Sequence, residues 1–322
     1  MTPRPIVIDT DPGQDDAVAL LLALASPELD VVGITAVAGN VPLPLTSRNT
    51  RVACELAGRP EVPVFAGCDR PMVRDLFTAE YVHGDTGLDG ADLPDPVMPL
   101  QDAHAVDFLA RLLTEADPES ITLCPLGLLT NIGTLLDRHP EARAGIREIV
   151  LMGGGFFEGG NTTPAAEFNI FVDPEAAEIV FRSGLAVTMI PLDATHQALI
   201  LPDHLRRLRA QGPVGEAVAG WLEFYERWDV EKYGMEGGPL HDPCVIAYLL
   251  QPDLFGAKAC HVAIETGSEL TRGMTVVDWW GVTGLSANCT VVAEVDSAGF
   301  FDLLIDRIGR LPITRRSRTP SS

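Results

Sequence analysis

Residues 5–17 read Pro-Ile-Val-Ile-Asp-Thr-Asp-Pro-Gly-Gln-Asp-Asp-Ala, and this stretch decides the fold. Its apolar run ends in acid at Asp9, and Asp11-Pro12-Gly13 has the composition of a tight turn. Apolar residues then recur at helical spacing as far as Leu24. A strand, a turn and a helix in this order are the opening of an α/β unit.

Outward from this unit, short apolar runs that suit buried strands alternate with segments of helical spacing. Parallel strands need a helical crossover between them, so the alternation predicts an α/β fold. We expect a single domain with a mostly parallel, doubly wound central sheet flanked by helices. The expected strands are 31–37, 62–66, 121–124, 149–152 and 186–191. The expected helices are 48–56, 103–116, 128–138 and 174–183.

The rest of the chain predicts a helical and β C-terminal portion of the same domain. The expected elements are helices over 202–250, β structure over 260–295 and a helix over 297–308. Gly237-Gly238-Pro239 breaks the helical region just before His241. The domain is expected to span residues 1–313, and the basic, polar residues 314–322 are expected to form a disordered tail.

Two irregular stretches interrupt the alternation. Residues 70–100 are rich in Gly, Asp and Pro, and residues 153–169 are rich in Gly. Neither stretch shows helical or strand periodicity. Long irregular loops in a compact domain are typically lids or binding loops, so both are candidates for a functional role.

Composition excludes several classes of function. The formal net charge of −22 argues against a nucleic-acid partner, because phosphate binding needs clustered Lys and Arg. The chain has two lysines and no GxxxxGK[S/T] motif, which excludes a P-loop nucleotide site. No apolar run approaches the roughly 18 residues of a membrane span, and no signal peptide precedes the first strand, so a cytoplasmic protein without a membrane partner is expected. The six cysteines form no CxxC pair and are expected to be buried thiols.

Four aspartates within eight residues are the strongest local signal: Asp9, Asp11, Asp15 and Asp16. In an open α/β sheet, ligands bind beyond the carboxyl ends of the strands, which is where this cluster falls. Helix capping explains one or two of these acids, whereas four like charges repel one another unless a cation compensates them. From spacing alone, capping and a metal site remain equal alternatives.

Two other metal or phosphate readings fit less well. An EF-hand needs acids at alternate positions with a Gly at the sixth, and that pattern is missing here. A DxD sequence at a strand end is also found in haloacid dehalogenase phosphatases, which need a lysine to hold the phosphate. The two candidates, Lys232 and Lys258, lie in no matching setting.

The longer string from Ile6 to Ala17 resembles the DTDPGxDDA signature of the inosine–uridine nucleoside hydrolase family. The resemblance continues through residues 37–40, 151–155, 166–169, 193–197 and 241–243. It implies calcium-dependent hydrolysis of the N-glycosidic bond of a ribonucleoside, which gives ribose and a free base. It also implies a small-molecule nucleoside partner, a place in nucleoside catabolism and salvage, and a homo-oligomer, either a tetramer or a dimer.

The same resemblance implies a role for each matching position. The calcium ligands would be Asp11, Asp16, Asp242 and the backbone carbonyl of Leu126, with Asp11 also the general base. The ribose hydroxyls would be bound by Asp15, Asn40, Asn161, Glu167 and Asn169. The remaining substrate contacts would be Met152, Tyr233, His83 on a flap over the site, and His241, which would lie near the base and donate a proton to it.

Several of these residues also have a structural explanation. Asn40 and Asn161 are typical of turns, and His241 and Asp242 precede Pro243 at a position that suits helix capping. Three further side chains are expected to be structural: His196 as a neighbour of the site, and Trp279 and Trp280 as packing residues or a subunit contact.

The substrate is less well defined than the family. Tyr233, eight residues before His241, is more typical of pyrimidine-preferring members, so uridine is the first expectation and a purine or broad-specificity hydrolase the alternative. A protein of another class, a calcium-dependent nucleoside- or ribose-binding protein without catalysis, is the second alternative. Asp11 argues against it, because binding alone needs no base.

Overall fold

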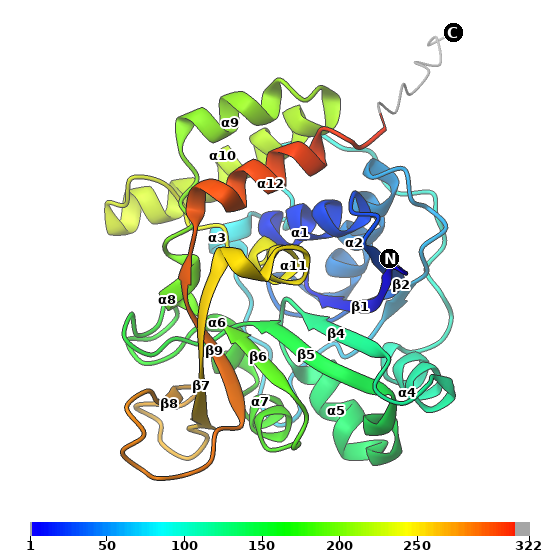
Figure 1. Ribbon diagram of the computed structural model, residues 1–322. Coiled ribbons are helices and arrows are strands. Elements are labelled where there is room, and N and C mark those ends of the chain that lie inside the picture. The colour runs from blue at the N-terminus through cyan, green and yellow to red at the C-terminus, as the bar shows by residue number, and fades with distance from the viewer. Residues whose placement is uncertain (1, 313–322) are drawn as a thin grey trace, which may run out of the picture.

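The structure is a computed structural model that describes residues 2–312, except for the side chains of Asp229 and Tyr233. Its centre is a nine-stranded sheet in the order β3-β2-β1-β4-β5-β6-β9-β7-β8 (Figure 1). The strands of its parallel part are β1 (Arg4–Thr10), β2 (Leu29–Ala36), β3 (Val64–Ala66), β4 (Ile121–Pro125), β5 (Ile146–Met152), β6 (Val187–Ile190) and β9 (Cys289–Val295). The strand order reverses between β1 and β4, which makes this the switch point where ligands bind in open α/β sheets.

One edge of the sheet is antiparallel. Strand β7 (Phe255–Ile264) pairs with β9 on one side and with β8 (Thr275–Asp278) on the other, both antiparallel. These strands account for the expected β-rich region at 260–295, and they extend the doubly wound sheet rather than forming a sheet of their own. The predicted α/β fold class is confirmed.

Helices cover both faces of the sheet (Figure 1). One face carries α1 (Gln14–Leu24), α2 (Leu43–Leu56), α9 (Pro202–Arg209), α10 (Pro213–Tyr233), α11 (Pro243–Leu250) and α12 (Ser297–Ile308). The other face carries α4 (Ala105–Glu115), α5 (Thr130–Arg138) and α7 (Pro174–Phe181). Short helices occur at α3 (Glu80–His83), α6 (Phe168–Val172) and α8 (Leu192–Thr195), and 3₁₀ turns occur at Pro140–Gly145 and Pro252–Leu254.

The first strand shows how the sequence builds this three-layer arrangement. Side chains alternate across a strand, so Ile6 and Ile8 pack with the helices of one face while Val7 packs with those of the other. All three are at most 1% exposed, as expected of a central parallel strand. Helix α1 lies against the face that Ile6 and Ile8 occupy, and every residue of α1 is buried.

The structure departs from the predicted elements at their ends. Helix α2 begins at Leu43 rather than at residue 48, because Pro44 in its first turn needs no backbone hydrogen bond there. The irregular stretch 70–100 contains the short helix α3, and the second irregular stretch already enters α6 at Phe168. The expected tail, 314–322, lies outside the described residues.

Among residues 2–312, none of the helices combines the length and the apolar character needed to cross a bilayer. The six cysteines are free thiols; Cys68 is partly exposed and the other five are buried, in agreement with the expectation.

Candidate active site

The turn after β1 places the aspartate cluster at the switch point of the sheet. Helix α1 starts after Gly13, whose backbone N–H donates to Oδ2 of Asp16 at 3.1 Å. Thr10 donates its hydroxyl to the other oxygen of Asp16 at 2.6 Å. Capping therefore explains part of the role of Asp16, as the structural alternative proposed.

Asp9 has a different role from the other three. Its Oδ1 accepts hydrogen bonds from the Thr35 hydroxyl at 2.5 Å and from Nδ2 of Asn131 at 2.7 Å. The carboxyl of Asp9 thus joins β1 to β2 and α5 inside the protein. Burial raises its pKa to about 7. Asp9 is a structural residue and does not line the pocket described below.

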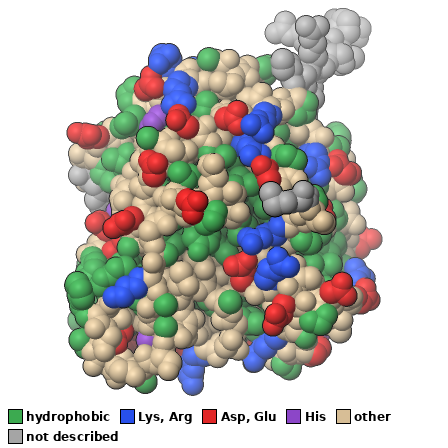
Figure 2. Space-filling model, viewed as in Figure 1, with side chains coloured by type: hydrophobic (Ala, Val, Ile, Leu, Met, Phe, Trp, Pro, Cys, Tyr) green, Lys and Arg blue, Asp and Glu red, His purple; other side chains and the backbone are tan. Residues whose placement is uncertain are grey.

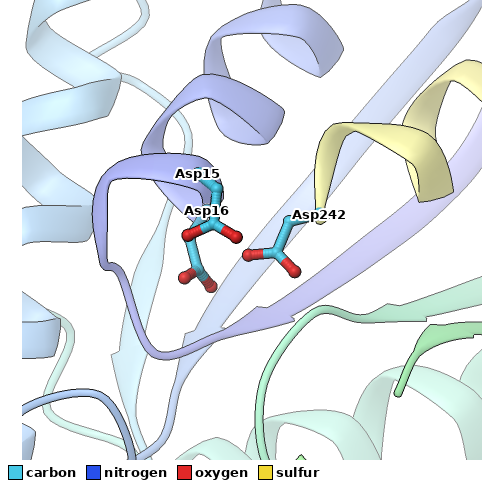
Figure 3. Close-up of side chains that lie close together, drawn as sticks. All are labelled: Asp15, Asp16 and Asp242. Carbon is cyan, nitrogen blue, oxygen red and sulfur yellow. The ribbon is translucent and has the colours of Figure 1, made fainter. Parts of the chain in front are cut away.

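Asp15, Asp16 and Asp242 form a compact carboxylate group (Figure 3). One oxygen of each lies within 4.8 Å of the others, and all three side chains are buried. Asp242 comes from the start of α11, more than 200 residues along the chain, yet its side chain makes no capping hydrogen bond to that helix. Helix capping therefore does not account for Asp242.

Asp11 lies beside this group in a space that two glycines leave open. A Cβ atom at Gly127 would lie 1.8 Å from Oδ1 of Asp11, and one at Gly39 would lie 1.9 Å from Oδ2. Oδ2 accepts the backbone N–H of Asn40 at 2.8 Å. Among the described residues, the buried Oδ1 has no hydrogen-bond partner.

The electrostatics of this acidic floor, by which we mean Asp11, Asp15, Asp16 and Asp242, require a compensating positive charge. Burial, followed by the charge of Asp16, raises the pKa of Asp11 well above its usual range. Burial and the charges of Asp15 and Asp16 do the same for Asp242. Like charges this close are stable only when protons or a cation neutralise them. A donor set made of oxygens alone fits a hard divalent cation such as Ca²⁺.

Polar side chains on neighbouring segments extend the acidic floor into a pocket. Asn40 donates its Nδ2 to Oδ2 of Asp16 at 3.1 Å. Asn169 donates its Nδ2 to the carbonyls of Leu126 at 2.7 Å and Met152 at 3.3 Å. The residues Asn40, Leu126, Met152 and Asn169 come from the ends of β2, β4 and β5 and from α6. The carboxyl ends of parallel strands therefore meet here, as the sheet topology requires.

Glu167 and Asn161 complete the polar side. Glu167 caps α6 and accepts the backbone N–H groups of Asn169 at 2.9 Å, Gly154 at 2.9 Å and Ile170 at 3.3 Å. Burial, only partly offset by these bonds, raises the pKa of Glu167 to about 7. Oδ1 of Asn161 accepts the backbone N–H of Phe168 at 3.1 Å.

Another part of the pocket lining consists of aromatic and imidazole rings, and we call it the ring wall. Its members are Tyr81, His83, Tyr225, Trp228 and His241. The His83 and Tyr225 rings stack at 5.6 Å, and the Tyr81 and Trp228 rings meet at 5.0 Å. The ring wall is thus assembled from α3 and α10, with His241 added at the start of α11.

His241 is fixed by a neighbour on α8. Its Nδ1 lies 2.7 Å from the hydroxyl of Thr195. Burial lowers the pKa of His241 to about 3, so its ring is neutral in the ligand-free protein.

The structure brings most of the sequence-predicted residues to one pocket. Its lining includes Asp15, Asn40, His83, Leu126, Met152, Asn161, Glu167, Asn169, His241 and Asp242. Asp11 and Asp16 lie just beneath it. The three carboxylates whose spacing suits a shared metal ion include Asp15. The calcium ligands expected from the sequence included Asp11 instead. The side chain of Tyr233, at the end of α10, lies outside the described part of the chain.

Sequence reasoning gave no role to Gln14, Tyr81 and Thr195. Tyr81 lies two residues before His83 in the irregular stretch, and an aromatic in a candidate lid is a signal that could have pointed to it. Gln14 and Thr195 act on histidines 69 and 46 residues away, and no local pattern marks such pairs.

The residues that were expected to be structural lie outside the pocket lining. His196 contacts Oε2 of Glu158 at 3.1 Å. Trp279 stacks on Phe156 at 5.2 Å, while Trp280 is 75% exposed. Trp279 therefore packs as expected, whereas for the exposed Trp280 the other expectation, a subunit contact, stays a prediction.

Comparison with known proteins gives a consistent result. The sequence model of a family described as inosine-uridine preferring nucleoside hydrolase matches residues 6–302. Proteins named pyrimidine-specific ribonucleoside hydrolase RihA are 50% identical in Photobacterium profundum, over 95% of this chain and 98% of that protein, and 50% identical in Escherichia coli, over 94% and 98%. A purine-preferring ribonucleoside hydrolase from Gardnerella vaginalis has a similar structure, with a TM-score of 0.89, 32% identity and coverage of 96% of this chain and 99% of that one.

Proposed function

The chain belongs to the inosine–uridine preferring nucleoside hydrolase family, and from this premise we propose that it is a calcium-dependent hydrolase with a preference for pyrimidine ribonucleosides. The observation that carries the proposal is one pocket that joins buried carboxylates of the acidic floor to the rings of the ring wall. Carboxylate and amide groups can hydrogen-bond to the hydroxyls of a ribose, and aromatic rings can stack on a planar base. A nucleoside would place its N-glycosidic bond between the two sides.

Calcium is the cation that the acidic floor fits best. A bound Ca²⁺ would supply orientation of the ribose hydroxyls and of the attacking water, together with charge compensation for the acids. We assign Asp16, Asp242 and the Leu126 carbonyl to hold it, with Asp11 and Asp15 beside them. Mg²⁺ prefers a tighter octahedral site and is the second candidate.

The general base is assigned to Asp11. Its buried Oδ1 has no hydrogen-bond partner among the described residues, and it packs so closely against Gly127 that a Cβ atom there would lie 1.8 Å away. That carboxylate can take a proton from a water positioned on the acidic floor. A positioned general base typically contributes about 10²–10⁴ to the rate.

The ribose is assigned to the polar side of the pocket. Asn40, Asn169 and Glu167 are already held in place by hydrogen bonds to the acidic floor, to carbonyls and to backbone N–H groups. Asn161 and Asp15 complete the set of sugar contacts. Because these groups are fixed before substrate binds, little entropy is lost in orienting the sugar, and such positioning is worth at most roughly 7–11 kcal/mol.

The leaving base is assigned to the ring wall. His241 is the candidate proton donor, although its neutral resting form limits it to hydrogen bonding until a proton reaches it. Cleavage passes through an oxocarbenium-like state, in which electron density moves onto the base. Hydrogen bonds to the base that strengthen in that state would accelerate the reaction.

The pyrimidine preference is supported by relatives rather than by the pocket itself. The RihA proteins at 50% identity are named pyrimidine-specific, whereas the solved Gardnerella vaginalis hydrolase, at 32% identity, is named purine-preferring. We expect uridine and cytidine to be the better substrates. Met152 is assigned to the substrate-binding surface on its position in the pocket lining.

Two further parts of the proposal concern the setting of the enzyme. We propose a cytoplasmic homo-oligomer, a tetramer or dimer, that acts in nucleoside catabolism. The exposed apolar side chains Trp280, Val282 and Leu285 offer a surface for a subunit contact. On the face drawn in Figure 2, Lys and Arg side chains lie in small groups beside Asp and Glu, which does not favour nucleic-acid binding.

The test is release of reducing sugar from uridine, cytidine, inosine and adenosine, with and without a chelator. We expect ribose from the pyrimidine nucleosides first, and loss of activity when the chelator is added. Ribose from the purines alone would reverse the proposed preference. Tight nucleoside binding in calorimetry without any ribose would favour the nucleoside-binding protein instead.

A further inference from the structure

Gln14 is a fully buried side chain that joins the start of α1 to the irregular stretch 70–100. Its Nε2 donates to the carbonyl of His83 at 2.9 Å and to the carbonyl of Asp89 at 3.0 Å. Its Oε1 lies 2.8 Å from Nδ1 of His83. One amide therefore contacts both the backbone and the ring of the same histidine.

The chemistry of these contacts fixes the orientation of the amide. A backbone carbonyl only accepts hydrogen bonds, so the two carbonyls must face the NH₂ group of Gln14. The oxygen of Gln14 is thereby turned toward the imidazole of His83. Because that oxygen can only accept, Nδ1 of His83 must carry a proton and donate it.

The tautomer of His83 follows from this. Burial lowers the pKa of His83 to about 3, so the ring is neutral and carries one proton. With the proton on Nδ1, Nε2 keeps its lone pair and is a hydrogen-bond acceptor. Among the described residues Nε2 has no hydrogen-bond partner, and the His83 side chain forms part of the pocket lining.

The ring has little freedom to turn away from this arrangement. A Cβ atom on Gly13 would lie 2.2 Å from Nδ1 and 2.5 Å from Cε1 of His83, so the ring rests against the backbone of the turn. The ring of Tyr225 stacks on it at 5.6 Å with an interplanar angle of 29°. Flipping the ring would place a carbon against the oxygen of Gln14 and lose the hydrogen bond.

We propose that Gln14 is a positioning residue that holds His83 in the Nδ1–H tautomer, so that the ring wall offers the base a hydrogen-bond acceptor. This inference rests on the proposed function, because it places a base against the ring wall. The proposal predicts that the preferred base has an N–H group that points toward Nε2 of His83. Uridine has one such group, the N–H of its uracil ring. A base methylated at that nitrogen would lose the bond and meet a steric clash.

The direct test reads the tautomer and needs no activity. ¹⁵N NMR of histidine-labelled protein separates protonated ring nitrogens from nitrogens with a lone pair, and the His83→Phe variant identifies the His83 signals among the seven histidines. We expect protonated Nδ1 and lone-pair Nε2 in the ligand-free wild type. A protonated Nε2 in the wild type would overturn the proposal, whether or not the protein hydrolyses nucleosides.

The functional test is a double-mutant cycle with Gln14→Met and His83→Phe. Methionine keeps the length of glutamine and removes both the donor and the acceptor. One net hydrogen bond corresponds to roughly a fivefold to tenfold loss of kcat/KM for uridine, and we expect that loss from Gln14→Met in the wild-type background and little of it in the His83→Phe background. The same loss in both backgrounds would show that Gln14 does not act through His83.

A substrate analogue and a control variant separate the loss of the hydrogen bond to the base from a general loss of activity. We expect the wild type to have a higher kcat/KM for uridine than for 3-methyluridine. In Gln14→Met the ratio of these two values should be smaller. An unchanged ratio would contradict an acceptor at this point. Gln251→Met, at an exposed position after α11, is the matched control and should leave both kcat/KM and the ratio unchanged. Wild-type protein that releases no ribose would refute the proposed function, while the NMR result would still decide the tautomer.

Discussion

The acidic floor and the ring wall belong to one pocket, but they are held in different ways. The acidic floor comes from the turn after β1, from the first turn of α1 and from the start of α11. Asp16 accepts bonds from Thr10 and Gly13, and Asp11 accepts one from the backbone of Asn40. The ring wall comes from α3 and α10, and ring contacts of 5.0–5.6 Å between these helices hold it together.

This difference suggests a division of labour. Groups fixed by hydrogen bonds to strand ends keep their positions through the reaction, which is what chemistry at the sugar requires. Rings held by contacts between separate helices can adjust to the base that enters. Changes in the acidic floor should therefore lower kcat, and changes in the ring wall should alter KM and base preference.

The largest effect is expected from Asp11→Asn. The amide cannot take a proton from water, so kcat should fall by about 10²–10⁴. Steady-state kinetics with uridine at saturating calcium measures it. Asp302→Asn, which removes a mostly exposed ion pair with Arg207, is the control and should keep wild-type kcat. An Asp11→Asn enzyme with wild-type kcat would show that another residue is the general base. It would also contradict the proposed division of labour between the acidic floor and the ring wall.

Calcium removal should also act on the acidic floor. The buried carboxylates repel one another, so a cation should stabilise the folded protein, by about 2.7 kcal/mol at one hundred times its Kd. Thermal unfolding with calcium and with a chelator measures this, and chelation should also abolish ribose release.

The Asp242→Ala variant sharpens the calcium prediction. It removes one of the three carboxylates whose oxygens lie within 4.8 Å of one another. We expect its unfolding temperature to respond to calcium much less than that of the wild type. An equal response in both proteins would place the cation elsewhere.

Glu167 should make substrate binding depend on pH. Its pKa is raised to about 7, so the carboxylate that we assign to the ribose hydroxyls is present above pH 7 and is lost as the pH falls through that value. In the unfolded chain it would ionise near its ordinary pKa of 4.5, so the raised pKa lowers the stability of the folded protein as the pH rises from about 4.5 to 7, and this loss stays constant above pH 7.

We expect kcat/KM for uridine to decline by up to about tenfold per pH unit below pH 7, in proportion to the ionised fraction of Glu167. The Glu167→Gln variant should have a lower kcat/KM at pH 8 and should lose this acidic limb of the profile. A limb that persists in the variant would assign the titration to another group.

The smallest effect is expected in the ring wall, from Trp228→Ala. Loss of one aromatic contact of about 0.5–1.5 kcal/mol should raise KM roughly twofold to tenfold and leave kcat nearly unchanged. Kinetics on uridine and inosine would also show whether base preference shifts. A large fall in kcat with constant KM would contradict the assignment of Trp228 to the base.

Local sequence determined much of the architecture. Alternating apolar runs and helical spacing predict the parallel strands and their helices, because burial on both faces of a sheet requires such runs. The string from Ile6 to Ala17 predicts a strand, a turn and a helix, and it contains the four clustered acids. The ends of elements were less predictable: α2 starts five residues before the expected position, with Pro44 in its first turn, because apolar spacing alone does not mark the first turn of a helix.

What only the tertiary structure decided is which of these residues meet. The sequence presents four aspartates as one cluster, yet Asp9 turns to Thr35 and Asn131 while Asp242 joins from the far end of the chain. The pairing of Gln14 with His83 spans 69 residues. The periodicity of apolar residues indicates which face of a helix or strand is buried. A polar contact between distant segments depends instead on how the helices and strands pack, and the whole fold determines that packing.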